Sequence, residues 1–202
     1  SRSHPWEQKK LMQDFLKQRI SRLRNLLKKE ELDAMIILDR VNNCYFTDFS
    51  CTYSILIIDL RDVLFITDAR YGEMAEKELH GFEVLVQPSA KAKQWLRKLW
   101  EKRSYKTAGF EGSITVDQRD ELKKWTPGTK IVKASDLRRK LRAVRGDMEV
   151  DRIRRAVRLA DRLMEYAFDY VQPGIQEASL SKVIRQGAEE LGGEGESFPN
   201  IV

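Results

Sequence analysis

Short apolar runs alternate with amphipathic stretches between residues 7 and 144 of this chain. Compact apolar runs bounded by turn residues are typical of buried strands, whereas apolar residues three or four positions apart are typical of helices. The strand candidates are residues 32–38, 54–60, 63–67, 82–86, 107–110 and 131–132. The helix candidates are residues 7–30, 69–79, 91–102, 115–125 and 135–144. This alternation predicts an α/β fold in which helices cover a mostly buried sheet.

The first part of this pattern also predicts local connections. Residues 54–60 and 63–67 form a hairpin candidate that we expect beside the first strand. Asn42 and Asn43 are turn formers and predict a turn after that strand. Asp68 predicts the N-cap of a helix that begins near Ala69.

A long helix is predicted from Met148 to Val171. Its apolar stripe consists of Val150, Ile153, Val157, Ala160, Met164, Ala167 and Val171. Pro173-Gly174 ends this helix, and a second helix is predicted over residues 177–191. Burial of one Val or Met side chain stabilises a fold by roughly 1.5–3 kcal/mol. We therefore expect the two helices to pack on each other and either to pair with another copy or to dock on the preceding domain.

Composition narrows the class of protein. Apolar residues make up 42% of the chain and charged residues 34%, which suits a domain with long solvated helices. No apolar run approaches the ~18 residues of a membrane span, and the N-terminus has no secretory pattern. Two cysteines are too few for a disulfide framework. We expect a cytoplasmic protein without a membrane partner; the alternative for Cys44 and Cys51 is a single bridge.

Basic residues outnumber acidic ones between Arg138 and Arg162, and the whole chain has a net charge of +6. Such a stretch can bind phosphates of nucleic acids, or it can be the solvated face of two helices. No aromatic residues for base stacking lie among the arginines. The solvated face is therefore the favoured interpretation, and a nucleic-acid partner is not expected.

The sequence contains few residues for catalysis or metal binding. His4 and His80 are its only histidines, and neither belongs to a paired Cys/His motif. Residues 192–195 lack the strand and helix that a dinucleotide-binding glycine loop requires, and we expect them to be mobile. We interpret three further carboxylates as turn and cap residues: Asp59, Asp62 and Asp68.

One polar and aromatic segment follows the first predicted strand. Its polar residues are Asp39, Arg40 and Asn43. Its aromatic residues include Tyr45, Phe46, Phe49 and Tyr53. Segments at strand ends often bind ligands or partners, which makes this a candidate binding site. The alternative is an aromatic core cluster capped by turn residues.

Several motifs resemble, in order, signatures of one protein family. Asn43–Phe49 resembles N-x-x-Y-L-T-G-F, Thr67–Tyr71 resembles T-D-x-R-Y, Gly109–Glu111 resembles G-F-E, and Leu141–Arg145 resembles L-R-x-I-K. Further matches are Glu149-Val150, Ile153-Arg154, Ala156, Pro173-Gly174 and Glu177. The chain thus resembles the creatinase/aminopeptidase P/prolidase family of pita-bread metallopeptidases.

The resemblance implies a domain order. Residues 1–134 would form an N-terminal domain with a mixed sheet flanked by helices, which mediates homodimerisation in the family. Residues 135–147 would form a linker helix, and residues 148–202 the truncated start of the pita-bread α+β catalytic domain. The segment containing Asp39, Arg40 and Asn43 would correspond to a loop that reaches toward the partner subunit's active site.

The resemblance also implies a chemistry for the complete enzyme. Family members hold two divalent metal ions (Mn, Co or Zn) through two Asp, one His and two Glu. The metals activate a water that attacks the peptide bond before proline. No position through Val202 matches that ligand set, so we expect the 202-residue chain to be inactive and assign it no catalytic or metal residue. The alternatives are a non-catalytic interaction module and a creatinase-type C–N hydrolase.

Three positions depart from the family pattern. Asp48 replaces the signature glycine, which predicts a different backbone conformation at that turn because glycine adopts positive φ more easily. Arg145 replaces lysine and keeps the charge. Gly146 follows it, where a helix former would make the connection stiffer.

Overall fold

The chain is described by a computed structural model, which covers residues 5–196 and 198–202. His4 therefore lies outside the described residues. The chain divides into two compact units: the first ends at Ala143 and the second comprises Val144–Val202. Each unit is described by itself.

The first unit contains a mixed sheet of six strands. The strands are β1 (Ala34–Ile37), β2 (Ser54–Asp59), β3 (Val63–Thr67), β4 (Glu83–Val86), β5 (Thr107–Phe110) and β6 (Lys130–Lys133). Their order across the sheet is β4-β3-β2-β1-β5-β6. β2 pairs antiparallel with both β1 and β3, whereas the other neighbouring pairs are parallel. All strands except β2 therefore end at the same edge of the sheet, and the predicted hairpin beside β1 is confirmed.

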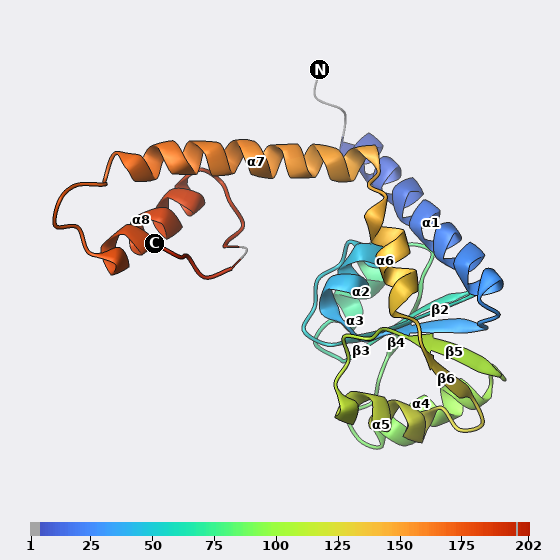
Figure 1. Cartoon of the computed structure of the whole chain (residues 1–202). Helices are drawn as coiled ribbons and strands as arrows, with labels where there is room; N and C mark the ends of the chain where they lie inside the picture. Colours follow the sequence, from blue (N-terminus) through green and yellow to red (C-terminus); the bar gives the residue numbers. More distant parts are fainter. Residues whose placement is uncertain (1–4, 197) are drawn as a thin grey trace. The chain divides into compact units, whose positions relative to one another are not determined.

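Helices cover both faces of this sheet (Figure 1). The helices of the first unit are α1 (Pro5–Lys29), α2 (Arg40–Thr47), α3 (Gly72–Glu78), α4 (Ala92–Glu101), α5 (Val116–Trp125) and α6 (Ser135–Ala143). Apolar side chains of α1, α2, α3 and α6 join one buried cluster, and those of α4 and α5 join the other. Successive strand residues enter opposite clusters, as a period of two requires: Met35 and Ile37 belong to the first, and Ala34 and Ile36 to the second. The predicted α/β fold with a mixed, covered sheet is confirmed.

Two local predictions are wrong. Asn42 and Asn43 do not form a turn but lie inside α2, because the Asp39 carboxylate accepts the N–H of Asn42 at 2.9 Å and caps a new helix. Asp68 does not cap a helix at Ala69 either. Its carboxylate accepts the N–H of Arg70 in a turn, and α3 begins only at Gly72.

Asp48 ends α2 in the left-handed region, with a φ of 54°. This is the conformation that glycine adopts most cheaply, and the N–H of Asp48 closes the helix on the Cys44 carbonyl at 2.8 Å. The aspartate therefore supports a C-terminal cap of the kind that glycine usually provides.

Residues 135–147, expected as a linker helix, contain α6 and the boundary between the units. Leu137 and Leu141 of α6 are buried in the cluster that α1 also joins. The first unit therefore includes α6 in its core. Gly146 then forms the N-cap of the next helix, where its N–H donates to the Glu149 carboxylate at 3.0 Å.

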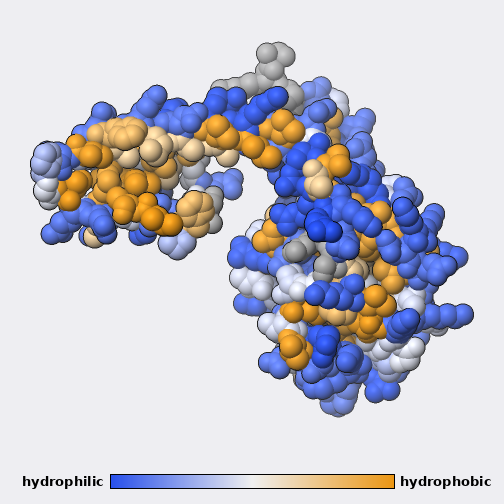
Figure 2. Space-filling view, in the orientation of Figure 1, coloured by the Kyte–Doolittle hydropathy of each residue, from blue (hydrophilic) through white to orange (hydrophobic). Residues whose placement is uncertain are grey.

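The second unit consists of α7 (Asp147–Phe168), α8 (Glu177–Glu190) and their connections. α7 and α8 pack against each other, as predicted. Gly187 permits their close approach, because a Cβ there would lie 2.6 Å from the Tyr166 ring. Most of the predicted apolar stripe remains exposed, including Ile153, Val157 and Met164. Figure 2 shows apolar side chains gathered along these two helices. Among the described residues, no helix is both long and apolar enough to cross a membrane.

Candidate functional site

Polar side chains gather where the strands β1, β3, β4 and β5 end. Asp39 follows β1, Asp68 follows β3, Gln87 follows β4 and Glu111 follows β5. In open α/β sheets, ligand sites favour the carboxyl ends of strands and points where the strand order changes direction. β1 lies at such a point, since the chain continues from it to β2, β3 and β4 on one side and returns to β5 and β6 on the other. This edge of the sheet is therefore the candidate site.

Glu111 is the most deeply buried charged residue at this edge, with 1% of its surface exposed. One carboxylate oxygen accepts the main-chain N–H groups of Leu38 and Asp39. The other oxygen accepts the side-chain amide of Asn42 at 2.7 Å. A carboxylate beside the first turn of a helix interacts favourably with the helix dipole, so Glu111 binds the N-terminus of α2 to the end of β5.

Burial raises the pKa of the Glu111 carboxyl, because an apolar environment disfavours its charged form. The hydrogen bonds from Asp39, Asn42 and Leu38 lower this pKa, and the nearby Asp39 charge raises it. The net direction is upward, so the folded chain binds a proton at Glu111 more readily than an unfolded chain does.

Asn42 links Glu111 to the last helix of the first unit. Its side-chain oxygen lies 3.4 Å from a guanidinium nitrogen of Arg142 on α6. Because Asn42 is itself buried, with 2% exposed, this contact is shielded from much of the solvent. A chain of polar contacts thus runs from β5 through α2 to α6.

The three polar residues predicted as a partner-reaching segment lie in different environments. Asp39 caps α2 and is partly exposed. Arg40 is exposed and donates to the Ser50 hydroxyl at 3.0 Å. Asn43 is buried, and its amide nitrogen lies 3.5 Å from the carbonyls of Ile37 and Ser54. Asp39 and Arg40 are therefore available at the surface, whereas Asn43 supports the helix from inside.

The structure separates the aromatic residues predicted as one cluster. Phe49 is buried against Phe65, with ring centroids 5.6 Å apart, and Tyr45 packs on the same side of the sheet. Tyr53 packs against the cluster on the opposite side, and its hydroxyl donates to Gln87 at 2.8 Å. Most of this aromatic surface belongs to the two cores.

Cys44 and Cys51 are not joined by a disulfide, so the alternative of a bridge between them is not realised. His80 is exposed at the end of α3. The predicted turn residues Asp59 and Asp62 are partners. The Asp59 carboxylate accepts the N–H groups of Arg61 and Asp62 at 2.7 and 2.5 Å. Asp59 thereby closes the hairpin between β2 and β3.

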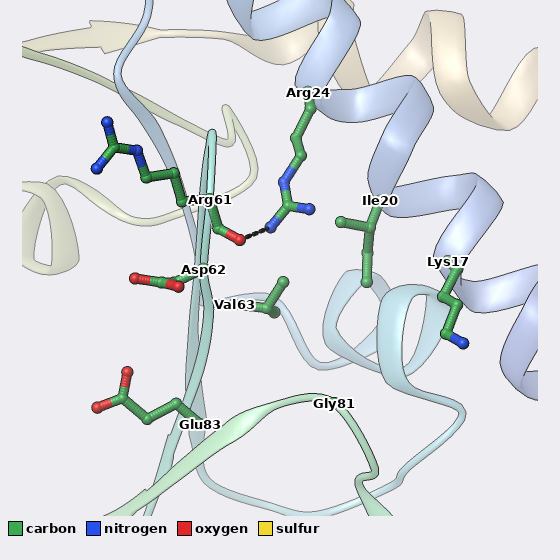
Figure 3. A pocket seen from close by; sticks show the side chains of 8 residues that line it. All are labelled: Lys17, Ile20, Arg24, Arg61, Asp62, Val63, Gly81 and Glu83. Carbon is green, nitrogen blue, oxygen red and sulfur yellow. Dashed lines mark hydrogen bonds between the residues drawn. The ribbon is translucent and has the colours of Figure 1, made fainter.

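A hollow of about 240 Å³ lies away from this edge, between α1 and the starts of β3 and β4 (Figure 3). The guanidinium group of Arg24 donates to the carbonyls of Asp59 and Arg61 at its rim. Asp62 and Glu83 are both bound by Arg103, at 2.5 and 2.6 Å. Arg24, Asp62 and Glu83, three of the charged residues that line the hollow, are therefore already paired within the protein.

The described residues do not fit a metal centre. Within residues 5–196 and 198–202, no three His, Cys, Asp or Glu side chains converge as metal ligands would. The two carboxylates at the start of α2 are already engaged: Asp39 caps the helix, and Glu111 accepts three hydrogen bonds. No catalytic step is therefore assigned to a metal bound by these residues.

Sequence reasoning missed the network of Glu111, Asn42 and Arg142. In the sequence, Glu111 stands out only as the end of a G-F-E motif, and Arg142 only within the L-R-x-I-K match and a basic stretch. A usable signal was present, because Glu111 directly follows an apolar strand candidate. A carboxylate at that place needs donors if the strand is buried.

Comparisons with known proteins agree with this fold. Residues 19–144 match the model of the Creatinase/Prolidase N-terminal domain, and residues 151–202 match that of Metallopeptidase family M24. An uncharacterized peptidase of Bacillus subtilis, YqhT, is 26% identical over 91% of this chain and 52% of its own length.

Two solved structures extend the comparison. The Xaa-Pro dipeptidase from Bacillus anthracis superimposes with a TM-score of 0.83 at 25% identity, over 91% of this chain and 51% of that one. The N-terminal domain of the cytoplasmic peptidase PepQ from Mycobacterium tuberculosis has a TM-score of 0.54 at 29% identity, over 61% of this chain and 97% of that one. The chain spans about half the length of the curated relatives it matches. It belongs to the creatinase/prolidase family, with the family's N-terminal domain followed by a segment of an M24 metallopeptidase domain.

Proposed function

We propose that this chain contributes the N-terminal domain and part of the catalytic domain of an Xaa-Pro peptidase, which hydrolyses the peptide bond before proline. The observation that carries this proposal is the order of the two family matches, residues 19–144 and then 151–202, in a single chain. The similarity to an Xaa-Pro dipeptidase across both units adds support. The substrates would be peptides with proline after the scissile bond.

The proposed enzyme uses two divalent metal ions, with Mn, Co and Zn as the candidates. The match to a metallopeptidase family supports a divalent metal in the relatives. Because no suitable ligand cluster occurs among the described residues, we expect residues other than those of this chain to hold the ions. The chain's own contribution is to fold the first unit and to position segments near the substrate.

We further propose that the first unit forms a homodimer and that Asp39 and Arg40 extend toward the partner's active site. The exposure of Arg40 and the partial exposure of Asp39 support this role. Asn43 would act from inside, since it is buried beneath them. A cytoplasmic location is supported by two cysteines that form no disulfide and by the resemblance to a peptidase described as cytoplasmic.

Two assays test the proposal. The 202-residue chain is expected to show no hydrolysis of Xaa-Pro dipeptides with Mn²⁺ or Co²⁺, and strong metal-dependent turnover would contradict this expectation. The protein encoded by the whole reading frame that contains this chain is expected to hydrolyse them. A folded product that cleaves creatine instead would favour the C–N hydrolase, and one without any hydrolysis would favour an interaction module.

The role of Arg40 is tested in the same complete protein. Arg40→Ala is expected to raise KM for an Xaa-Pro dipeptide by about tenfold, which corresponds to the loss of one charged contact of roughly 1.4 kcal/mol. Arg97→Ala is the matched control, because Arg97 is an exposed arginine on α4. Equal KM values for the two variants would remove Arg40 from the substrate site.

A further inference from the structure

A polar network centred on the buried carboxylate of Glu111 joins three elements of the first unit. The end of β1 contacts it through the N–H groups of Leu38 and Asp39, and α2 contacts it through Asn42. The helix α6 joins through Arg142, which contacts the other end of the Asn42 amide at 3.4 Å. These residues are far apart in the sequence, so only the folded unit brings them together.

The chemistry of these groups determines which of them donates and which accepts each hydrogen bond. A carboxylate can only accept hydrogen bonds, and a guanidinium can only donate them. The Asn42 amide must therefore turn its nitrogen to Glu111 and its oxygen to Arg142, as the structure has it. The reverse orientation would place two acceptors together at one end and two donors together at the other.

The same network fixes the first turn of α2. Glu111 holds the Asp39 N–H, while the Asp39 carboxylate holds the N–H of Asn42 at 2.9 Å. The main chain is thus fixed on both sides of Arg40, whose side chain is exposed. The backbone that carries Asp39 and Arg40 therefore has little conformational freedom.

We propose that Glu111 is the positioning residue of the Asp39–Arg40 segment, and that Asn42 transmits this position to Arg142 on α6. Because α6 is the last helix of the first unit, the network joins the segment to the end of that unit. The use of the segment in peptide binding rests on the proposed function. The positioning itself can be measured in the 202-residue chain.

The decisive variant is Glu111→Gln, which keeps the shape of the side chain but replaces one acceptor oxygen with a donor. If its carbonyl accepts the N–H groups of Leu38 and Asp39, its amide nitrogen faces the Asn42 nitrogen. Either that contact breaks, or Asn42 turns over and presents its nitrogen to Arg142. One link of the network is lost in both cases. The neutral carbonyl is also a weaker acceptor than the carboxylate for the N–H groups of Leu38 and Asp39.

Asn42→Asp provides a rescue. An aspartate at position 42 would accept from both the glutamine introduced by Glu111→Gln and Arg142, so the double variant regains every link. Asn42→Asp alone places two carboxylates in contact and breaks the network. Glu76→Gln is the control for the loss of one charge, because Glu76 is exposed on α3.

The measurement is amide hydrogen exchange of the full 202-residue chain, followed by NMR. We expect Leu38 and Asp39 to exchange about tenfold faster in each single variant, and within about threefold of the wild type in the double variant. Amides of β2 and β3 report general destabilisation, and a purely structural role would accelerate them in parallel. Glu76→Gln should change none of these rates.

Unchanged exchange at Leu38 and Asp39 in Glu111→Gln would overturn the proposal, as would a double variant that behaves like the sum of the singles. If Glu111→Gln does not fold, recovery of the folded chain in the double variant supports the network, and failure to recover overturns it. These outcomes are independent of peptidase turnover. Failure of the proposed function is seen instead in the hydrolysis assays.

Discussion

The first unit encloses most of its apolar side chains, whereas the second leaves many of them on the surface. Ile36 at the centre of the sheet is fully buried, while Ile153 on α7 is 49% exposed. The first unit has a sheet with helices on both faces, so each strand side chain meets a covering layer. The second unit has two packed helices, and one face of α7 has no such layer within the unit. A long amphipathic helix therefore does not by itself make a closed core.

The largest effect is expected in the core of the first unit. Phe65→Ala should lower the free energy of unfolding by about 3–5 kcal/mol, because it leaves a cavity beside Phe49 in a fully buried site. Leu11→Ala, at an exposed position of α1, should change it by less than about 0.5 kcal/mol. Urea unfolding followed by tryptophan fluorescence measures both. Equal effects would mean that the first unit is not the closed core described above.

A smaller effect is expected at the contact between α7 and α8. Gly187→Ala should destabilise the second unit by about 1–3 kcal/mol, because its Cβ would lie 2.6 Å from a carbon of the Tyr166 ring. Thermal unfolding followed by circular dichroism at 222 nm measures the loss. Tyr166→Ala removes the clashing ring, so adding Gly187→Ala to it should cost little more. A full additional loss in the double variant would contradict this explanation.

The ion pairs of Arg103 are expected to contribute less again. Its guanidinium binds Asp62 and Glu83 at 2.5 and 2.6 Å and joins the hairpin between β2 and β3 to the start of β4. Arg103→Gln should lower the free energy of unfolding by about 1–2 kcal/mol, as measured by urea unfolding. This loss should become smaller as the salt concentration rises. The control Arg97→Gln breaks an exposed pair on α4 and should cost about 0.3–0.5 kcal/mol. A loss for Arg103→Gln no larger than that of the control would show that the network adds nothing.

Glu111 should give the first unit a characteristic dependence on pH. Its pKa is raised in the folded chain, chiefly by burial. Between its ordinary pKa and this raised value, the folded state binds more protons than the unfolded state. The free energy of unfolding should therefore fall as pH rises through this window. Urea unfolding of the wild type and of Glu111→Gln is measured across this pH range. The difference between the two free energies of unfolding removes the contribution of the other carboxylates, and a difference that rises with pH would contradict the assignment.

The smallest effect is expected on the exposed face of α7. Val157→Ser should change the free energy of unfolding by less than about 0.5 kcal/mol, because Val157 is 54% exposed. Thermal unfolding and sedimentation velocity measure stability and association together. A loss above about 2 kcal/mol, or a smaller assembly than the wild type forms, would mean that another surface covers this face in solution.

The elements of the fold could be predicted from the sequence because each has a clear period. The strand candidates at residues 54–60 and 63–67 coincide with β2 and β3 to within a residue or two. The helix at residues 40–47 was missed although Asp39 offers a local cap, because its first turn also depends on Glu111, which lies some seventy residues away. Contacts of that range leave no local pattern.

The candidate site was only partly visible for the same reason. Asp39 and Arg40 could be identified from their position after a strand, since strand ends often carry function. The burial of Asn43 and the separation of Tyr45 from Tyr53 depend on which face of the sheet each residue meets. That outcome depends on strand order, which the sequence pattern does not determine.

Residue-resolved amide hydrogen exchange of the intact 202-residue chain tests the contrast between the units most directly. Amides of β1, β2 and β3 should exchange only through global unfolding of the first unit, with Leu38 and Asp39 among the protected positions. Amides of α7 and α8 should exchange at least about a hundredfold faster, through opening of the second unit alone. Uniform protection across both units would contradict the account, because it would require the exposed face of α7 to be covered.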